Sequence, residues 1–173
     1  YNYDREGRII GMQTEAGYTF YELDSVGQPV MIYHPITQER RTMYLSYDAG
    51  GRITSVNIDG IGEVSYQYAN TNGGGDFAGR LKSISYPNGW NTQIRTDDRG
   101  QIEQLSLNDS VGDVGWMDKY DYDRMGNVAS VSSTADDSKS ASFVYDANHR
   151  LYVIDDAGYY EGLGASNIEY SYD

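Results

Sequence analysis

The sequence of 173 residues lacks cysteine altogether, and it has only three prolines and few basic side chains. Without cysteine, disulfide bonds and zinc–thiolate sites are excluded. The 13 lysines and arginines face 26 aspartates and glutamates, so the formal net charge is −13. Such an acidic chain is unsuited to binding phosphate backbones. No apolar run approaches the length that spans a bilayer. We therefore expect neither nucleic-acid binding nor a membrane span.

The apolar residues are dominated by tyrosine. The chain has 18 tyrosines but three phenylalanines, together with 20 glycines. Tyrosine combines an apolar ring with a polar hydroxyl, so its rows suit the wet faces of a sheet better than a dry core. The length is that of one domain and would allow a sizeable core if the chain closed on itself.

One short motif carries most of this pattern, and its clearest copy is the segment Tyr47-Asp48-Ala49-Gly50-Gly51-Arg52-Ile53. Tyr47 favours a half-buried strand. The Asp48 carboxylate can accept hydrogen bonds from backbone N–H groups a few residues later and so close a turn. Gly51 can adopt a positive φ at the end of a short hairpin loop. Ile53 begins the return strand, so the segment predicts a β-hairpin.

The motif recurs about seven times at intervals of roughly 20 to 28 residues, which is the period of a repeat protein. Leu23 takes the tyrosine position of the second copy, Ala69 the aspartate position of the fourth, and His149 the glycine position of the seventh. An eighth copy starts at Tyr170, so we expect a single repeat region over 1–173 that is cut within a motif at both ends. The motif positions are Tyr3, Asp4, Gly7, Arg8, Asp24, Gly27, Tyr47, Asp48, Gly51, Arg52, Tyr68, Gly79, Arg80, Asp97, Gly100, Tyr122, Asp123, Gly126, Tyr145, Asp146, His149 and Arg150.

Each return strand carries two apolar residues three positions apart. Examples are Ile53 with Val56 and, in the second copy, Val30 with Tyr33. The runs are short, β-branched and bounded by turn residues, so we interpret them as strands and not helices. Residues i and i+3 point to opposite faces of a regular strand. Either both faces are covered, or a β-bulge returns the second residue to the first face.

Variable turns separate the regular ones, for example His34-Pro35-Ile36-Thr37, Tyr86-Pro87-Asn88-Gly89 and the segment 108–113. Each repeat is therefore two strands, one regular turn and one variable turn. We predict an all-β fold of about fourteen antiparallel strands, in hairpin repeats that form a curled or spiralling sheet.

The motif Tyr-Asp-x-x-Gly-Arg-Ile/Leu at this period resembles the YD repeat of the RHS/YD-repeat family. That family includes Rhs polymorphic toxins, the B and C components of insecticidal toxin complexes, wall-associated proteins and teneurins. The resemblance covers essentially the whole chain and implies a strand spiral that wraps into a hollow shell, often around a toxin. Family shells use many more repeats than this chain has. The motif at which an Rhs core ends is absent, because no aspartate precedes any of the three prolines.

Alternatives that involve chemistry are weaker. His34 and His149 lie in different turns, without a partner nucleophile in either, so catalysis is disfavoured. The aspartates could hold Ca²⁺, but none matches a calcium loop and a turn explains them equally well. The segment Gly73-Gly74-Gly75 lacks the lysine of a phosphate-binding loop. We predict no cofactor and no metal. The aspartates weighed for calcium are Asp97, Asp98, Asp118, Asp121, Asp123, Asp136, Asp137, Asp155 and Asp156.

The many tyrosines and arginines allow two interpretations. We favour aromatic ladders with guanidinium stacking between repeats over a carbohydrate-binding surface, because the tyrosines recur at the motif position. The sequence therefore predicts a structural, non-enzymatic YD-repeat segment of an exported bacterial protein, located outside the cell or at its surface. Its partners would be further YD repeats of the same or an adjacent chain, and an enclosed toxin domain and a surface glycan are further candidates. An extracellular tube or filament assembled through uncapped β edges, and a glycan-binding adhesin, are the alternatives.

Overall fold

The computed structural model describes residues 1–15, 17–36, 39–70, 78–134, 140–156 and 167–172. The chain divides into two compact units, Tyr1–Gln67 with Ile84–Gly89 and Tyr68–Ser83 with Trp90–Asp173. Every regular element in the described ranges is a strand, so no helix there is long and apolar enough to cross a membrane. The predicted all-β class is confirmed.

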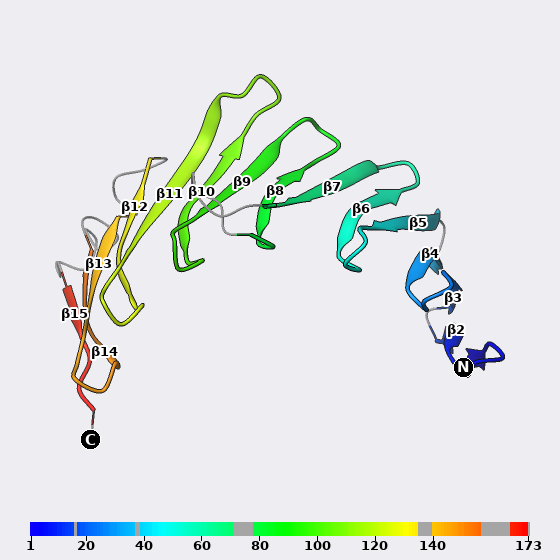
Figure 1. Ribbon diagram of the computed structural model, residues 1–173, viewed down its shortest axis with the longest axis horizontal. Helices are drawn as coiled ribbons and strands as arrows, with labels where there is room; N and C mark the ends of the chain where they lie inside the picture. Colours follow the sequence, from blue (N-terminus) through cyan, green and yellow to red (C-terminus); the bar gives the residue numbers. More distant parts are fainter. Residues whose placement is uncertain (16, 37–38, 71–77, 135–139, 157–166, 173) are drawn as a thin grey trace. The chain divides into compact units, whose positions relative to one another are not determined.

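The strands follow one another along the chain (Figure 1). They are β1 (Asn2–Tyr3), β2 (Ile9–Thr14), β3 (Gly17–Leu23), β4 (Pro29–Ile36), β5 (Glu39–Tyr47), β6 (Ile53–Ile58), β7 (Gly62–Tyr68), β8 (Leu81–Ser85), β9 (Asn91–Thr96), β10 (Ile102–Asn108), β11 (Val114–Tyr122), β12 (Val128–Ser133), β13 (Ala141–Tyr145), β14 (Leu151–Asp156) and β15 (Asn167–Glu169). The count exceeds the predicted fourteen by one because β15 directly precedes the eighth copy, which starts at Tyr170.

Antiparallel pairing between strands that are consecutive in sequence builds both units. In the first unit β1 to β7 pair in order, and in the second β9 to β15 do so, while β8 contributes residues to both units. Neither described sheet closes on itself. Successive strands are rotated relative to each other (Figure 1), as the right-handed twist of strands requires. The predicted antiparallel hairpin repeat is therefore confirmed.

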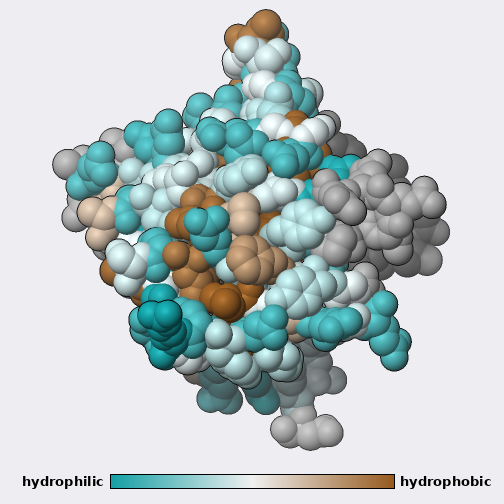
Figure 2. Space-filling model, turned by 90° about the vertical axis from the view of Figure 1, so that its right-hand side faces the viewer, coloured by the Kyte–Doolittle hydropathy of each residue, from teal (hydrophilic) through white to brown (hydrophobic). Residues whose placement is uncertain are grey.

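Each sheet has one apolar and one polar face. In the first unit Ile32, Met43 and Ile58 are cross-strand partners on one face, and Tyr44, Asn57 and Glu63 are partners on the other. The second unit repeats this with Phe143, Ile154 and Ile168 against Asp121, Ser130, Ser142 and Asp155. Seen from the side of Figure 1 that carries β2–β4, apolar side chains gather in a patch among polar ones (Figure 2).

The described residues do not form the buried apolar core that a globular domain of this length usually has. Ala69 is the only buried apolar residue among them, and no described side chain is fully buried. The buried polar residues are Thr19, Thr96, Ser106, Asn108 and Ser133. The apolar face of each sheet is half-buried by its own neighbouring side chains, which agrees with the expected wet, tyrosine-rich face.

A β-bulge follows every regular turn for which a register is defined. Tyr47 pairs with Ile53 but Ser46 pairs with Ser55, so Thr54 is the extra residue. The bulge places Ile53 and Val56 on the same face and confirms one of the two predicted explanations for the spacing of three. The extra residues in the six bulges are Ile10, Val30, Thr54, Glu103, Ala129 and Tyr152.

The pair predicted for the second copy is wrong. Leu23 pairs with Pro29 and Glu22 with Met31, so Val30 is itself the bulged residue. The pair equivalent to Ile53 and Val56 is therefore Pro29 and Ile32. Val30 fits the apolar pattern of the return strand better than Pro29 does. The sequence therefore placed the first apolar residue of this strand one position too late.

Candidate functional site

The repeated turn is closed by its aspartate. In the third copy Oδ1 of Asp48 accepts hydrogen bonds from the backbone N–H groups of Gly50 and Arg52, at 2.9 and 3.0 Å. The N–H of Asp48 donates to the carbonyl of Arg52 at 2.9 Å, and the N–H of Gly51 donates to the carbonyl of Asp48 at 3.0 Å. The same four bonds close the turns of Asp4, Asp24, Asp97, Asp123 and Asp146.

The fourth copy keeps the backbone of this turn without its carboxylate. The N–H of Ala69 donates to the carbonyl of Arg80 at 2.9 Å, and the N–H of Gly79 donates to the carbonyl of Ala69 at 2.7 Å. The inserted residues 71–77, which include the glycine run weighed above, lie outside the described residues. The backbone of the fourth copy therefore forms the predicted turn even though alanine replaces the aspartate.

Glycine is favoured at the fourth position of the turn because φ is positive there. The value is +78° at Gly51 and +91° at Gly126. His149 holds the same position with φ at +63°, the only positive φ among the described non-glycine residues. Histidine is one of the residues that tolerate this region at some cost.

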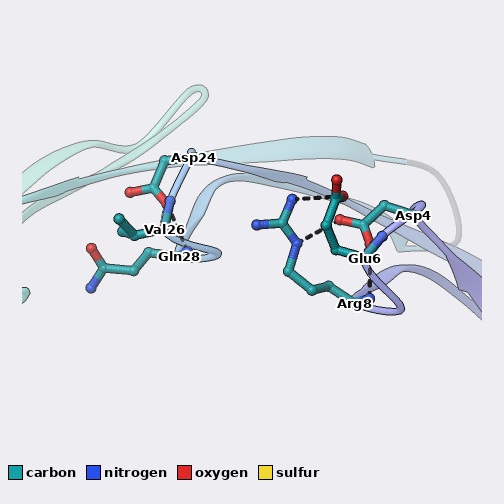
Figure 3. A network of polar contacts seen from close by, with 6 residues as sticks. All are labelled: Asp4, Glu6, Arg8, Asp24, Val26 and Gln28. Atoms are coloured by element: carbon teal, nitrogen blue, oxygen red, sulfur yellow. Dashed lines mark hydrogen bonds and ion pairs between the residues drawn. The ribbon is translucent and has the colours of Figure 1, made fainter.

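The position after the glycine takes one of two roles. Where it is arginine and the copy keeps its aspartate, the side chain turns back onto that aspartate, with Nε of Arg8 2.6 Å from Oδ2 of Asp4 (Figure 3). Arg52 with Asp48 and Arg150 with Asp146 form the same pair, at 2.7 and 2.8 Å. These partly exposed pairs complete the turn, and each is a weak contribution to stability by itself.

Where the position is glutamine, the side chain reaches the next repeat instead. Nε2 of Gln28 donates to the carbonyl of Gly51, and Nε2 of Gln101 donates to the carbonyl of Gly126, both at 3.0 Å. Figure 3 shows Gln28 directed away from its own Asp24, in contrast to the arginine of the preceding turn. Sequence reasoning missed this bond between repeats.

The motif tyrosine provides the second bond between repeats. The hydroxyl of Tyr47 donates to the carbonyl of Pro29 at 2.7 Å, and that of Tyr145 donates to the carbonyl of Val128 at 2.9 Å. Tyr122 with Ile102 and Tyr172 with Leu151 follow the same rule, at 2.7 and 2.6 Å. In each case the acceptor lies five residues after the aspartate position of the preceding copy.

Guanidinium stacking accompanies this bond at the last pair of copies. Cζ of Arg150 lies 4.3 Å from the ring centroid of Tyr172, which bears out the stacking between repeats predicted from the tyrosine and arginine content. Side chains at the tyrosine position and at the position after the glycine therefore link consecutive turns. We call these linked turns the turn ladder.

The hydrogen bonds and charges of the turns shift the pKa of their carboxyl groups. The pKa of Asp48 is lowered by the backbone N–H and then the side chain of Arg52. The pKa of Asp123 is lowered most by the amide of Asn127, and that of Asp146 most by the N–H of Arg150. At Asp4 and Asp97 partial desolvation acts upward, but the hydrogen bonds to the carboxylate outweigh it and the pKa is again lowered.

One variable turn proves to be a copy of the regular one. Oδ1 of Asp109 accepts hydrogen bonds from the N–H groups of Val111 and Asp113, at 3.0 and 2.9 Å, and Gly112 has a φ of +92°. This turn joins β10 to β11, so it lies at the strand ends opposite those of the turn ladder. Its spacing of Asp-x-x-Gly was the signal that would have identified it.

The residues weighed for catalysis or metal binding do not converge. Nδ1 of His34 lies 2.6 Å from Oγ1 of Thr19, and His149 contacts Asn127 within the turn ladder. In the ranges that the structure describes, no three histidine or acidic side chains form a group that could hold a metal ion. Asp136 and Asp137 lie outside those ranges.

Comparison with known proteins gives a fold but no close relative. No family model and no curated protein matches the chain. Solved structures do match. The crystal structure of TcdB2-TccC3-Cdc42 is 18% identical over 79% of this chain, with a TM-score of 0.65. This is the YD-repeat fold expected from the motif. The Photorhabdus luminescens Tc holotoxin pore gives 18% identity, 79% coverage and a TM-score of 0.63.

A third structure, of TcdB2-TccC3-TEV, matches 86% of the chain at 15% identity, with a TM-score of 0.57. The chain spans only 7% of the length of the first two proteins and 9% of the third. The likeness therefore establishes the fold of this YD-repeat segment, and the activity of a whole protein is a matter for the proposal below.

Proposed function

We propose that the chain is a non-enzymatic wall segment of an exported, Rhs-type shell that encloses a toxin. The observation that supports this most strongly is the turn ladder. Its aspartates, glycines and tyrosines are engaged in closing turns and joining repeats. Residues that are occupied in this way serve the geometry of a wall, which favours a structural function over catalysis.

The similar structures support the same proposal. Each contains a TcdB2-TccC3 complex or a Tc holotoxin, and each shares the repeat fold with this chain. The acidic, hydrophilic composition fits a protein exposed to water on a wide surface, with a mean hydropathy of −0.65. The partners in this proposal are further YD repeats and an enclosed toxin domain, outside the producing cell.

Electron microscopy of the purified protein tests the proposal. A wall segment assembles with further repeats, so we expect closed, hollow particles. Long regular fibres would instead assign the extracellular filament, and discrete monomers at every concentration would contradict both.

Two glycine variants make this experiment specific. Gly126 and Gly112 have φ of +91° and +92°, but only Gly126 lies in the turn ladder, beneath the amide of Gln101. Valine at either position introduces the same backbone strain. We expect Gly126→Val to lose the closed particles and Gly112→Val to retain them. Equal loss in both variants would show that general destabilisation, and not the ladder, governs assembly.

A further inference from the structure

Where a tyrosine occupies the motif position and forms the bond between repeats, its surroundings are the same from copy to copy. A ring from one copy lies against the start of the return strand of the preceding copy and donates its hydroxyl to a carbonyl there. At the last of these tyrosines a guanidinium also lies over the ring. Cζ of Arg150 is 4.3 Å from the ring centroid of Tyr172. The hydroxyl of Tyr172 donates to the carbonyl of Leu151 at 2.6 Å. Arg150 keeps its ion pair with Asp146 in this arrangement.

The second copy has the same surroundings without the ring. Leu23 takes the tyrosine position, and leucine has neither an aromatic ring nor a hydroxyl. The carbonyl that corresponds to the acceptor Leu151 is that of Ile9, five residues after Asp4. Arg8 corresponds to Arg150 and forms the same ion pair with its own aspartate.

A hollow of 340 Å³ occupies this place, and such a volume lies within the range of small-ligand pockets. The lining is mostly apolar, and Arg8 provides the one charged side chain among the described residues that form it. Two tyrosines, Tyr1 and Tyr21, line the hollow together with Arg8, Ile9, Leu23 and Pro29, among others. Apart from Tyr1, the lining residues come from β2, β3, β4 and the turns beside them.

We propose that this hollow binds a para-substituted phenol, which replaces the missing tyrosine of the second copy. The phenol ring would fill the apolar space, its hydroxyl would donate to the carbonyl of Ile9, and the guanidinium of Arg8 would stack on its face. Arg150 combines an ion pair and a stacked ring at the equivalent position, so the ion pair of Arg8 with Asp4 is compatible with stacking. Nη2 of Arg8 also lies 3.4 Å from Oε2 of the exposed Glu6. The para substituent takes the place of the tyrosine backbone.

Two sources can supply this chemistry, a free phenolic compound or a tyrosine side chain from another protein. p-Cresol represents the first and N-acetyltyrosinamide the second. Binding of p-cresol with exclusion of N-acetyltyrosinamide would assign the site to free phenols. Binding of both would assign it to a tyrosine presented by a partner.

The test is titration of the intact protein with p-cresol, followed by NMR chemical-shift changes of Leu23 and Met12. Toluene is the control that lacks the hydroxyl. One hydrogen bond corresponds to a factor of about three to ten in affinity, so p-cresol should bind tighter than toluene by that factor. Leu23→Tyr fills the hollow from within and should weaken p-cresol binding at least tenfold. Equal p-cresol affinity in the wild type and Leu23→Tyr would overturn the proposal.

Thermal unfolding of two variants provides an independent readout. Leu23→Phe supplies the ring alone, and Leu23→Tyr supplies the ring and the hydroxyl. One added hydrogen bond should place the melting temperature of Leu23→Tyr about 2–4 °C above that of Leu23→Phe. A Leu23→Tyr protein that melts below the wild type would show that the hollow does not accept a tyrosine ring, and would also overturn the proposal.

Discussion

Replacement of Gly51 by valine separates the two functions that the structure assigns to the turn glycine. The first is conformational, because φ is +78° and a β-branched residue held in that region costs about 1–3 kcal/mol. The second is contact with the neighbouring repeat. A Cβ atom at Gly51 would lie 3.0 Å from Nε2 of Gln28, which donates to the carbonyl of the same glycine.

The magnitude follows from the sum of these terms. Displacing the amide of Gln28 forfeits a hydrogen bond worth about 0.5–1.5 kcal/mol. We therefore expect Gly51→Val to lower the free energy of unfolding by about 1.5–4.5 kcal/mol. Gly7 has a φ of +80° and nothing within 4 Å of an added Cβ, so Gly7→Val isolates the conformational term.

Urea unfolding, followed by circular dichroism, measures both variants against the wild type. The loss for Gly51→Val should exceed the loss for Gly7→Val by about 1 kcal/mol. If both variants unfold like the wild type, the positive φ is refuted. If they lose equal stability, the contact between repeats contributes nothing, and the turn ladder is refuted as a source of stability.

Three further predictions concern single groups in the ladder. His149→Gly relieves a positive φ of 63° and should raise the free energy of unfolding by about 1 kcal/mol, and a lower melting temperature would contradict the strain. Tyr47→Phe loses the hydrogen bond to the carbonyl of Pro29 and should cost about 1 kcal/mol in urea unfolding, whereas the 46% exposed Tyr44 should tolerate phenylalanine unchanged. The lowered pKa of the turn aspartates gives a stabilising contribution that is fully present above their ordinary value of 3.8 and is lost as the pH falls through the folded-state values. Stability should therefore decline as the pH falls from about 5 to about 2, and an unchanged urea midpoint over that range would count against the aspartate bonds.

Local chemistry explains why the sequence predicted the turns so well. The hydrogen bonds of Asp48 and the φ of Gly51 depend on residues within one turn, so their spacing specifies the geometry. The aspartate turn at Asp109 was missed only because it stands alone between variable segments. The bulge was foreseen as an alternative, but its position in the second copy depends on strand register, which the proline at position 29 obscured.

Contacts between repeats could not be derived in the same way. Nothing in the sequence indicates that Gln28 reaches the carbonyl of Gly51 while Arg52 folds back onto Asp48. The choice depends on where the next turn lies in space. The hollow beside Leu23 could not be predicted for the same reason. Leucine at the tyrosine position leaves a hollow only where the neighbouring repeats enclose that position, and the sequence does not show how they lie.

The central claim is that the repeated motif serves turn geometry and stacking, and amide hydrogen exchange measured by NMR tests it most directly. The N–H groups two and four positions after each motif aspartate are bonded to its carboxylate, and the N–H of the third position is bonded to its carbonyl. We predict slow exchange at these three positions and fast exchange at the first, repeated in all six turns that keep the aspartate. Uniformly fast exchange through the turns would contradict the account.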